Sequence, residues 1–342
     1  MRALLIVGVA TLVLGVARAG ETLRVGAWSL PLPVGLPAAA ARWPAGDAPS
    51  PARIELGRAL FFDPRLSRDA TVACASCHDP AHGLADPRPR SLGVGAAASR
   101  RHAPAAVNRL FSAAQFWDGR AADLETQLRF PLLDPHEMAM PSTDAVAAAV
   151  RAVPGYAPLF AAAYGDARVD FDRIARALAD YERTLVSGDS PFDRFAAGDA
   201  TALSPAARRG LTAFRGRGHC ATCHLGPNFT DERFHNTGIG MAAPAPDLGR
   251  WTVTQRDEDR GAFKTPTLRN VAQTAPYMHD GSLATLAEVI AHYDAGGLRN
   301  AWLSRELQPL MLSEQERRDL IAFLAALSGP IANASPPSQL PR

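Results

Sequence analysis

The chain has 342 residues, 47% of them hydrophobic, so it is long enough to bury two medium-sized hydrophobic cores. Its 36 basic and 34 acidic side chains leave a net charge of only +2, and no run of lysine or arginine interrupts this balance. This composition argues against an intrinsically disordered chain and against a nucleic-acid-binding protein.

The first 19 residues have the features of a secretory signal peptide. Met1 and Arg2 precede an apolar stretch, and Ala17-Arg18-Ala19 places small residues at the two positions that signal peptidase reads. The apolar stretch is shorter than the ~20 residues needed to span a bilayer, although an uncleaved N-terminal anchor is the alternative. We therefore expect a protein that is exported to the periplasm and has no membrane span in its mature form.

Apolar residues recur at helical spacing in seven segments, many of which begin at Ser, Thr, Asp or Pro. Alternation typical of strands is scarce, so the pattern predicts a mainly α-helical protein. The long connections 79–105 and 235–263 are rich in Gly and Pro. Loops of this length usually need a bound ligand to become ordered. The helical segments are residues 52–61, 119–130, 143–152, 169–187, 204–215, 283–293 and 313–327.

All four cysteines fall in two copies of a Cys-x-x-Cys-His pattern, the attachment signature of c-type haem. Two thiols on one turn bind the two vinyl groups of a porphyrin, and the adjacent histidine ligates the iron. Disulfide bonds, a zinc site and a thioredoxin-like pair are weaker alternatives, because none explains two copies that each end in histidine and lie far apart in the chain. The two copies are Cys74, Cys77 and His78, and Cys220, Cys223 and His224.

The paired signature indicates an old duplication, with one haem in each half of the chain. We expect the boundary near residue 200, within the sequence AAGD at 196–199. The full division is a signal peptide (1–19), an N-terminal extension (20–50), a first haem domain (51–200), a second haem domain (201–330) and a C-terminal tail (331–342).

Four further segments resemble those of the bacterial dihaem cytochrome c peroxidases and their relative MauG. They are 59–67 (ALFFDPRLS), 116–120 (FWDGR), 263–270 (FKTPTLRN) and 275–282 (APYMHDGS), and the resemblance runs from about residue 50 to 328. It implies a mainly α-helical fold of two cytochrome c-like domains, each wrapping one covalently bound haem c. It also implies a calcium ion between the domains and hydrogen peroxide as the oxidant.

The resemblance makes the first haem the one that reacts with peroxide. Typical family peroxidases carry Ser-x-Gly-His, whose histidine ligates the resting iron, where this chain has Ser91-Leu92-Gly93-Val94. Valine cannot ligate iron, so we expect the first haem to be open without activation. His82 and His102 are possible replacements for the missing ligand.

The family's distal Gln, Pro and Glu match Gln127, Pro131 and Glu137. Cleavage of the O–O bond requires moving a proton from one peroxide oxygen to the other. The resemblance assigns this role to Glu137, which would otherwise be read as a surface loop residue, and assigns peroxide positioning to Gln127. His136 is an uncertain neighbour.

Trp117 matches the family's tryptophan between the two haems, where an aromatic ring can carry electrons. A core-filling tryptophan is the alternative. The calcium ligands of the family match the Asn108 side chain and the backbone carbonyls of Thr274 and Pro276. Oxygen ligands of this kind suit a hard cation.

The second haem is expected to have a second axial ligand. Family peroxidases place a methionine fourteen residues after the histidine that corresponds to His279, and this chain has Tyr293 there, as MauG has tyrosine. Met278 is the alternative ligand. A tyrosinate stabilises oxidised iron, whereas methionine raises the reduction potential.

Three functions follow from this reading. The first is a peroxidase that takes electrons from a small periplasmic cytochrome c or cupredoxin, and the second is a MauG-like oxidase that oxidises side chains of a partner protein. The third, a dihaem electron carrier, is disfavoured because transfer alone needs no open iron beside Glu137. Val94 and Tyr293 favour MauG-like chemistry, but the tryptophan that MauG has just before its second signature is absent, so Trp251 and Trp302 are alternative exit points for electrons.

Overall fold

A computed structural model describes residues 21–342, so the predicted signal peptide lies outside the described residues. The described part is mainly α-helical, as predicted, and its strands form only two short antiparallel pairs, β1 (Thr22–Val25) with β2 (Trp28–Pro31) and β3 (Phe234–His235) with β4 (Phe263–Lys264). Within this range no single helix is long and apolar enough to cross a membrane. The helices are α1 (Pro51–Phe61), α2 (Leu124–Leu133), α3 (Thr143–Arg151), α4 (Tyr156–Tyr164), α5 (Phe171–Thr184), α6 (Pro191–Ala196), α7 (Pro205–Arg215), α8 (Trp251–Thr254), α9 (Leu286–Asp294) and α10 (Glu314–Ala325).

Each of the seven predicted helical segments overlaps a helix. Helix α2 begins later than predicted, because the Gln115 N–H donates to the Ala121 carbonyl (2.8 Å) and closes a turn before the helix. Asp123 then caps α2 by accepting from the Thr126 N–H. Helix α4 was not predicted, because its sequence, YAPLFAAAY, is almost uniformly apolar and lacks an amphipathic period.

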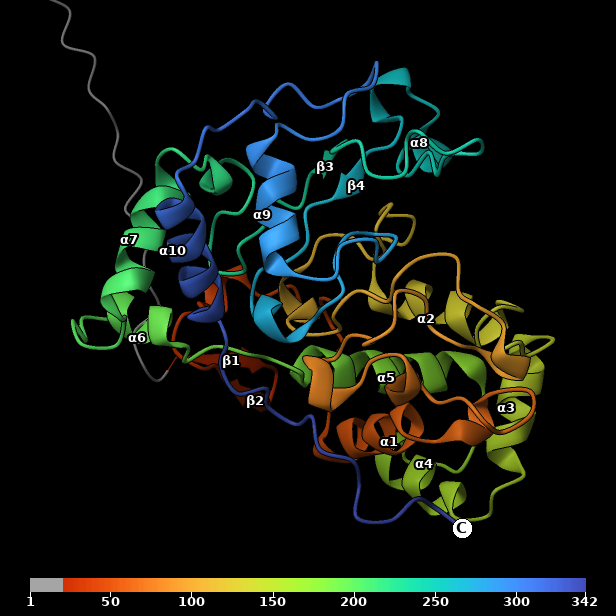
Figure 1. The fold of residues 1–342 in the computed structure, drawn as a ribbon. Coiled ribbons are helices and arrows are strands. Elements are labelled where there is room, and N and C mark those ends of the chain that lie inside the picture. Colours follow the sequence, from red (N-terminus) through yellow and green to blue (C-terminus); the bar gives the residue numbers. More distant parts are fainter. Residues whose placement is uncertain (1–20) are drawn as a thin grey trace, which may run out of the picture.

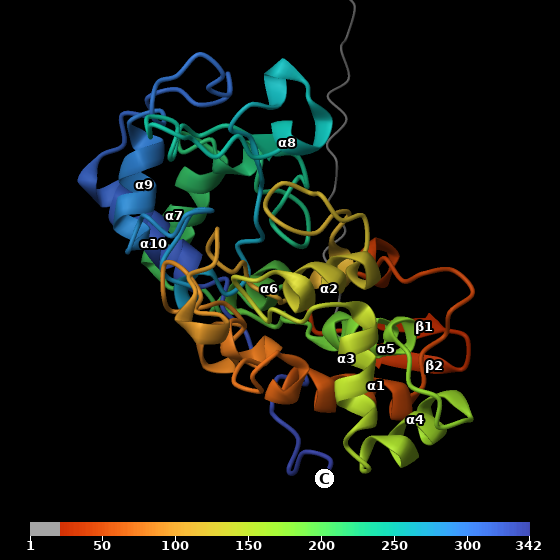
Figure 2. The ribbon, with the colours of Figure 1, turned by 90° about the vertical axis from the view of Figure 1, so that its right-hand side faces the viewer.

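The described chain folds into two halves, each around its own hydrophobic cluster. The first cluster runs from Leu56 to Leu185 and includes residues of α1 to α5, and the second runs from Leu203 to Leu327 and includes residues of α7, α9 and α10. Figures 1 and 2 show the corresponding helices as two separate groups. The predicted boundary near residue 200 falls between the buried residues of the two clusters, but α6, which precedes it, packs on the second cluster through Phe192 and Phe195. The division of the chain stays a prediction.

The two halves repeat one pair of packed helices. Helix α1 packs on α5 at Gly57, which lies against the Ala177 carbonyl, and α7 packs on α10 at Gly210, which lies against the Asp319 carbonyl. A Cβ atom at either glycine would overlap that carbonyl oxygen. Glycine is therefore required for the close approach of the helices in both halves, and the repetition agrees with the duplication inferred from the paired signatures.

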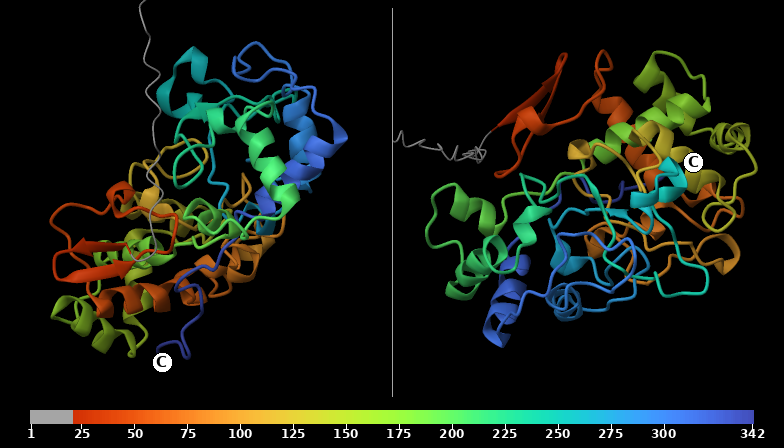
Figure 3. Two further views of the ribbon diagram at one scale, coloured as in Figure 1. Left: turned by 90° about the vertical axis from the view of Figure 1, so that its left-hand side faces the viewer. Right: turned by 90° about the horizontal axis from the view of Figure 1, so that it is seen from above.

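Both ends of the described chain pack on the first half. Leu30 and Leu36, from the N-terminal segment that forms β1 and β2, cluster with Leu110, and Figure 3 shows this hairpin on the outside of the molecule. After α10 the chain returns to the first half, where the Gly155 N–H donates to the Arg342 carbonyl (2.6 Å). Figure 1 accordingly shows the C-terminus near α4.

Candidate dihaem site

Each Cys-x-x-Cys-His signature folds into the same tight turn. The N–H of His78 donates to the Cys74 carbonyl (2.9 Å), and the N–H of His224 donates to the Cys220 carbonyl (2.9 Å). All four cysteines lie in the described residues, and no disulfide joins them. The thiols are therefore available for the thioether bonds of haem c.

Both signature histidines are prepared to bind iron. Nδ1 of His78 donates to the Leu84 carbonyl (3.2 Å), and Nδ1 of His224 donates to the Phe229 carbonyl (2.9 Å). This hydrogen bond leaves Nε2 as the metal-binding atom. Burial lowers the pKa of both imidazoles, which favours the neutral form that ligates a metal. The residues present therefore fit two haem c groups.

The first signature borders a cavity of about 640 Å³, called here the first cavity. Helix α2 and the loop that follows it bring the residues assigned to peroxide chemistry to this cavity. The structure thus places them together with the first signature, and their catalytic roles stay predictions. The cavity wall contains Cys74, Cys77, His78, Trp117, Gln127, Pro131 and Glu137.

Two acidic residues of this wall, Glu182 and Glu137, have environments that suit proton transfer, and the resemblance assigns the role to Glu137. Burial, reinforced by the nearby Asp134 carboxylate, raises the pKa of its carboxyl to about 7. A group with a pKa near the working pH can both accept and donate a proton. His136 is exposed and does not line the cavity, so it is poorly placed for the same task.

The segment that carries Val94 packs against the backbone of Glu137. The Val94 N–H donates to the Glu137 carbonyl (2.8 Å), and a Cβ atom on Gly93 would overlap the His136 carbonyl oxygen. The Val94 side chain is buried in the first hydrophobic cluster. The segment therefore lies close to the proposed acid-base residue, and its Val94 side chain offers no ligand for iron.

Of the two histidines considered as replacement ligands, only His102 reaches the first cavity. His82 is bound to the Asp79 carboxylate (2.8 Å) and does not line the wall. His102 is buried and lines the wall, with Nδ1 3.1 Å from the Arg88 carbonyl oxygen. Of His82 and His102, the fold therefore brings only His102 to the first cavity.

The second signature borders a cavity of about 240 Å³, called here the second cavity. Cys220, Cys223 and His224 line it, and so do both candidates for the second axial ligand, Tyr293 and Met278. Tyr293 lies near the end of α9, where burial raises the pKa of its phenol.

The internal repeat extends to these cavity walls. Residues 102–131 and 264–293 correspond at one constant separation in the sequence. Asn108 and Asn270 occupy equivalent positions, and both adopt a positive φ (57° and 60°) before a short 3-10 turn. The turn around Trp117 is closed by the hydrogen bond from the Gln115 N–H to the Ala121 carbonyl. The turn around His279 is closed by the equivalent bond, from the Tyr277 N–H to the Leu283 carbonyl.

In this register Met278 corresponds to Phe116, and Tyr293 corresponds to Pro131. Phe116 and Met278 both have a positive φ (68° and 71°), and each begins its turn. Pro131 and Tyr293 lie at equivalent positions of α2 and α9 and line their respective cavities. Neither Phe116 nor Pro131 can ligate iron, whereas their equivalents Met278 and Tyr293 both can and both line the second cavity. Tyr293 therefore stays the predicted ligand, with Met278 as the alternative.

Trp117 lies between the two cavities and lines both. Its Nε1 donates to the His102 carbonyl (2.8 Å), and its carbonyl accepts from the Lys264 N–H (2.7 Å). The repeat supplies the reciprocal bond, in which the His102 N–H donates to the His279 carbonyl (2.8 Å). Trp117 therefore lies at the junction where backbone bonds join the halves.

The residues predicted to bind calcium do not share one cavity wall. Thr274 and Pro276 line the second cavity, whereas Asn108 lines neither. Both polar atoms of the Asn108 amide are bonded to the backbone of Ser187: Nδ2 donates to its carbonyl (3.0 Å), and Oδ1 accepts from its N–H (2.7 Å). Asn108 thus has a structural role, and the calcium site stays a prediction.

Three charged residues of the cavity walls were not predicted from the sequence; Glu182 and Lys264 are buried, and Arg109 is half-buried. Arg109 lines both cavities, Glu182 lines the first, and Lys264 lines the second. Burial raises the pKa of Glu182 to about 7 and lowers that of Lys264 to about 8. The two cations suit the carboxylates of a porphyrin. In the sequence these three residues look like ordinary surface charges. Only the fold shows that they line the cavities.

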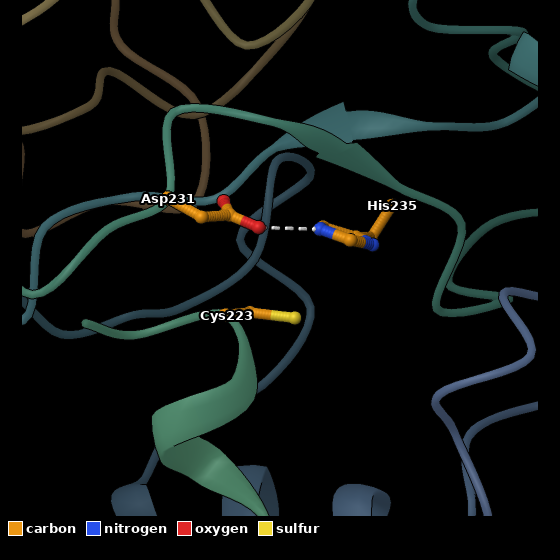
Figure 4. Close-up of side chains that lie close together, drawn as sticks. All are labelled: Cys223, Asp231 and His235. Carbon is orange, nitrogen blue, oxygen red and sulfur yellow. Dashed lines mark hydrogen bonds and ion pairs between the residues drawn. The ribbon is translucent and has the colours of Figure 1, made fainter. Parts of the chain in front are cut away.

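Figure 4 shows a further cluster beside the second signature. The Asp231 carboxylate is bound to Nε2 of His235 (2.9 Å), and the Cys223 thiol lies within 4.8 Å of both groups. Such groups could hold a metal ion, but attachment of haem c consumes the Cys223 thiol. The cluster therefore belongs to the haem site.

Trp251 and Trp302 line neither cavity. The Arg260 guanidinium lies 4.6 Å from the ring centroid of Trp251 and 5.4 Å from that of Trp302. Asp257 accepts from the Trp302 indole N–H (3.1 Å). Their use as exit points for electrons stays a prediction.

Known proteins resemble this chain over most of its length. The family described as "Di-haem cytochrome c peroxidase" matches residues 51–201. The methylamine utilization protein MauG of Methylorubrum extorquens is 44% identical over 301 residues, covering 87% of this chain and 84% of that protein. The cytochrome c551 peroxidase of Pseudomonas aeruginosa is 39% identical over 282 residues, covering 80% and 78%. The crystal structure of a MauG-like protein associated with microbial copper homeostasis is 33% identical, with a TM-score of 0.82, covering 89% of this chain and 96% of that chain.

Proposed function

The chain belongs to the family of di-haem cytochrome c peroxidases and MauG, and we propose that it reduces hydrogen peroxide at the first site with electrons drawn from a partner protein through the second. Membership of this family makes the protein a haem c oxidoreductase with two cytochrome c-like helical domains. The observation that carries the proposal is the first cavity, where His78, Gln127 and Glu137 meet.

The two signatures would hold the haem groups through four thioether bonds and the Nε2 atoms of His78 and His224. When bound, these groups supply the iron that reacts with peroxide at the first site and exchanges single electrons at the second. Overall, one peroxide takes up two electrons and two protons and gives two molecules of water.

Glu137 moves the proton that this reaction needs. As a carboxylate it accepts the proton of the inner peroxide oxygen, and as a carboxylic acid it returns that proton to the outer oxygen, which leaves as water. The pKa of about 7 suits both half-steps. The Gln127 amide orients the peroxide from the same wall.

Trp117 carries electrons between the sites. Both aromatic side chains of the FWDGR segment, Phe116 and Trp117, line both cavities. The Trp117 indole N–H is fixed on the His102 carbonyl, so the ring has one orientation in the wall between the cavities.

A second candidate function is oxidation of side chains on a partner protein, as the resemblance to MauG suggests. The observation that favours it is Tyr293, which lines the second cavity at the position equivalent to Pro131. A phenolate ligand would favour storage of oxidising equivalents over acceptance of electrons from a mild donor.

Steady-state assays separate the two candidates. A peroxidase consumes one peroxide for every two molecules of a reduced small cytochrome c or cupredoxin that it oxidises. A protein that consumes peroxide yet oxidises no such donor, but does modify a secreted protein encoded by a neighbouring gene, has the second function. If the haems accept electrons from the donor but no peroxide is consumed, the protein is an electron carrier.

Two further parts of the proposal rest on the sequence. Residues 1–19 would direct the chain to the periplasm, where c-type haem and the proposed partners occur. A calcium ion near Thr274 and Pro276 would stabilise the region between the sites, and elemental analysis of the purified protein measures it.

A further inference from the structure

The turn that carries Trp117 is held by the other half of the molecule. Three consecutive carbonyls, those of Trp117, Asp118 and Gly119, all accept hydrogen bonds from the second half. The first accepts from the Lys264 N–H (2.7 Å). The second and third accept from Nη1 of Arg250, at 2.9 Å and 3.0 Å.

The side chain of Asp118 is held as well. It accepts from Nη1 of Arg101 (2.6 Å). The Nε–Nη2 edge of the same guanidinium donates to the Asp247 carboxylate, at 2.7 Å and 2.9 Å. The side chains of Arg101 and Asp118 are only 16% and 4% exposed. Paired, charge-assisted bonds of this geometry are strong and directional, so Arg101 ties the turn to the loop just before Arg250.

The shape of the contact leaves Arg250 little freedom. Its guanidinium lies over the Phe234 ring, 4.3 Å from the centroid. Gly119 has a φ of 67°, and a Cβ atom there would overlap the Phe234 ring and crowd Nη1 of Arg250. Glycine at this position thus allows the guanidinium to reach both carbonyls.

The equivalent turn of the repeat is held differently. Its His279 carbonyl accepts from the His102 N–H. Among residues 21–342, however, no side chain donates to the carbonyls of Asp280 or Gly281. The arginine contact is therefore specific to the turn that carries the indole and does not belong to the repeated fold.

We propose that Arg250 is a positioning residue for Trp117, so that electron exchange between the two haems depends on this contact across the halves. The proposal rests on the proposed function of Trp117 as the electron carrier. Arg250 touches neither cavity. It acts by fixing the two backbone carbonyls that follow Trp117, those of Asp118 and Gly119.

The test measures electron exchange between the haems in the holoprotein. Carbon monoxide is flashed from protein that holds one electron, and absorbance follows redistribution of that electron. We expect Arg250→Met, which keeps length and apolar packing on Phe234, to slow exchange by about tenfold or more, since misplacement by about 1 Å can cost about 10²-fold in rate. Arg250→Lys, which keeps a charged donor, should restore part of the rate.

A second readout and a matched control keep the test independent of catalysis. Hydrogen exchange of the amides in 115–121 should accelerate in Arg250→Met. Arg256→Met is the control, because this side chain lies on the same loop, is 69% exposed and contacts only Glu258 among ionic partners. It should leave both readouts at the parent values.

A double-mutant cycle with Trp117→Phe separates the two ideas. We expect Trp117→Phe to slow exchange and Arg250→Met to have no further effect in that background. If Trp117→Phe slows exchange but Arg250→Met does not, the positioning role is wrong while Trp117 keeps its function. If Trp117→Phe changes nothing, or Arg250→Met slows exchange equally in both backgrounds, Arg250 does not act through Trp117.

Discussion

Replacing Glu137 by glutamine keeps the size of the side chain but removes its ability to accept a proton. A positioned acid-base group typically contributes about 10²–10⁴-fold to rate, so we expect Glu137→Gln to slow the reaction with hydrogen peroxide by a factor in this range. Stopped-flow absorbance measures this step before any partner is known. His136→Gln, one residue away and exposed, is the control. A slow His136 variant and a fast Glu137 variant would reverse the assignment.

The raised pKa of Glu137 predicts how the same step depends on pH. Burial raises this pKa from its usual value to about 7, so the carboxyl is mostly protonated below pH 7 and mostly ionised above it. Since the carboxylate is the form that accepts the first proton, the rate constant should rise with pH around that value. The rise should disappear in Glu137→Gln. A flat profile in the parent protein would show that another group takes the proton.

The ligand of the second haem can be tested by a pair of substitutions. Tyr293→Phe removes the phenol oxygen, so the low-spin spectrum of this haem should change. Met278→Leu should leave the spectrum nearly unchanged, because we expect Tyr293, not Met278, to ligate this iron. Electron paramagnetic resonance measures both. A change in the Met278 variant alone would return the protein to the methionine-ligated peroxidases.

At the scale of elements, the paired glycines predict where the helices cannot tolerate a larger side chain. Gly57→Ala and Gly210→Ala each add a methyl group against a carbonyl of the packed partner helix. Overpacking of this kind costs about 1–3 kcal/mol of the free energy of unfolding. Thermal unfolding measures the loss. Gly216→Ala, at the end of α7 where the nearest atom is 3.0 Å away, should cost less. Equal losses would argue against the close helix contacts.

The helices could be predicted where local signals were strong. Helices α5, α7 and α10 combine an apolar stripe with a capping residue, Asp170, Ser204 and Ser313. Helix α4 lacks such a stripe. The turn around Trp117 could not be predicted as a turn, because it is closed by a backbone bond and held by Arg250 from a distant part of the chain.

At the scale of the whole molecule, the site residues also divide into those that local sequence patterns predict and those that depend on the fold. The haem signatures are local patterns, and Glu137 and Tyr293 could be proposed as site residues from their distance to motifs of the resembled family. Arg109, Glu182 and Lys264 could not, because only the fold shows that they lie in the cavity walls. The assignment of Asn108 to calcium stays a prediction, and the fold adds that both of its amide atoms are bonded to the backbone of Ser187.

We expect the first site to be open in the fully oxidised protein and to react there with peroxide. Stopped-flow mixing of the oxidised, as-purified holoprotein with hydrogen peroxide tests it most directly, with electron paramagnetic resonance of the same sample before mixing. We predict one high-spin and one low-spin haem before mixing and a rapid spectral change after it, with no prior reduction. Two low-spin haems and no reaction until an electron is added would contradict the account and indicate a distal ligand such as His102.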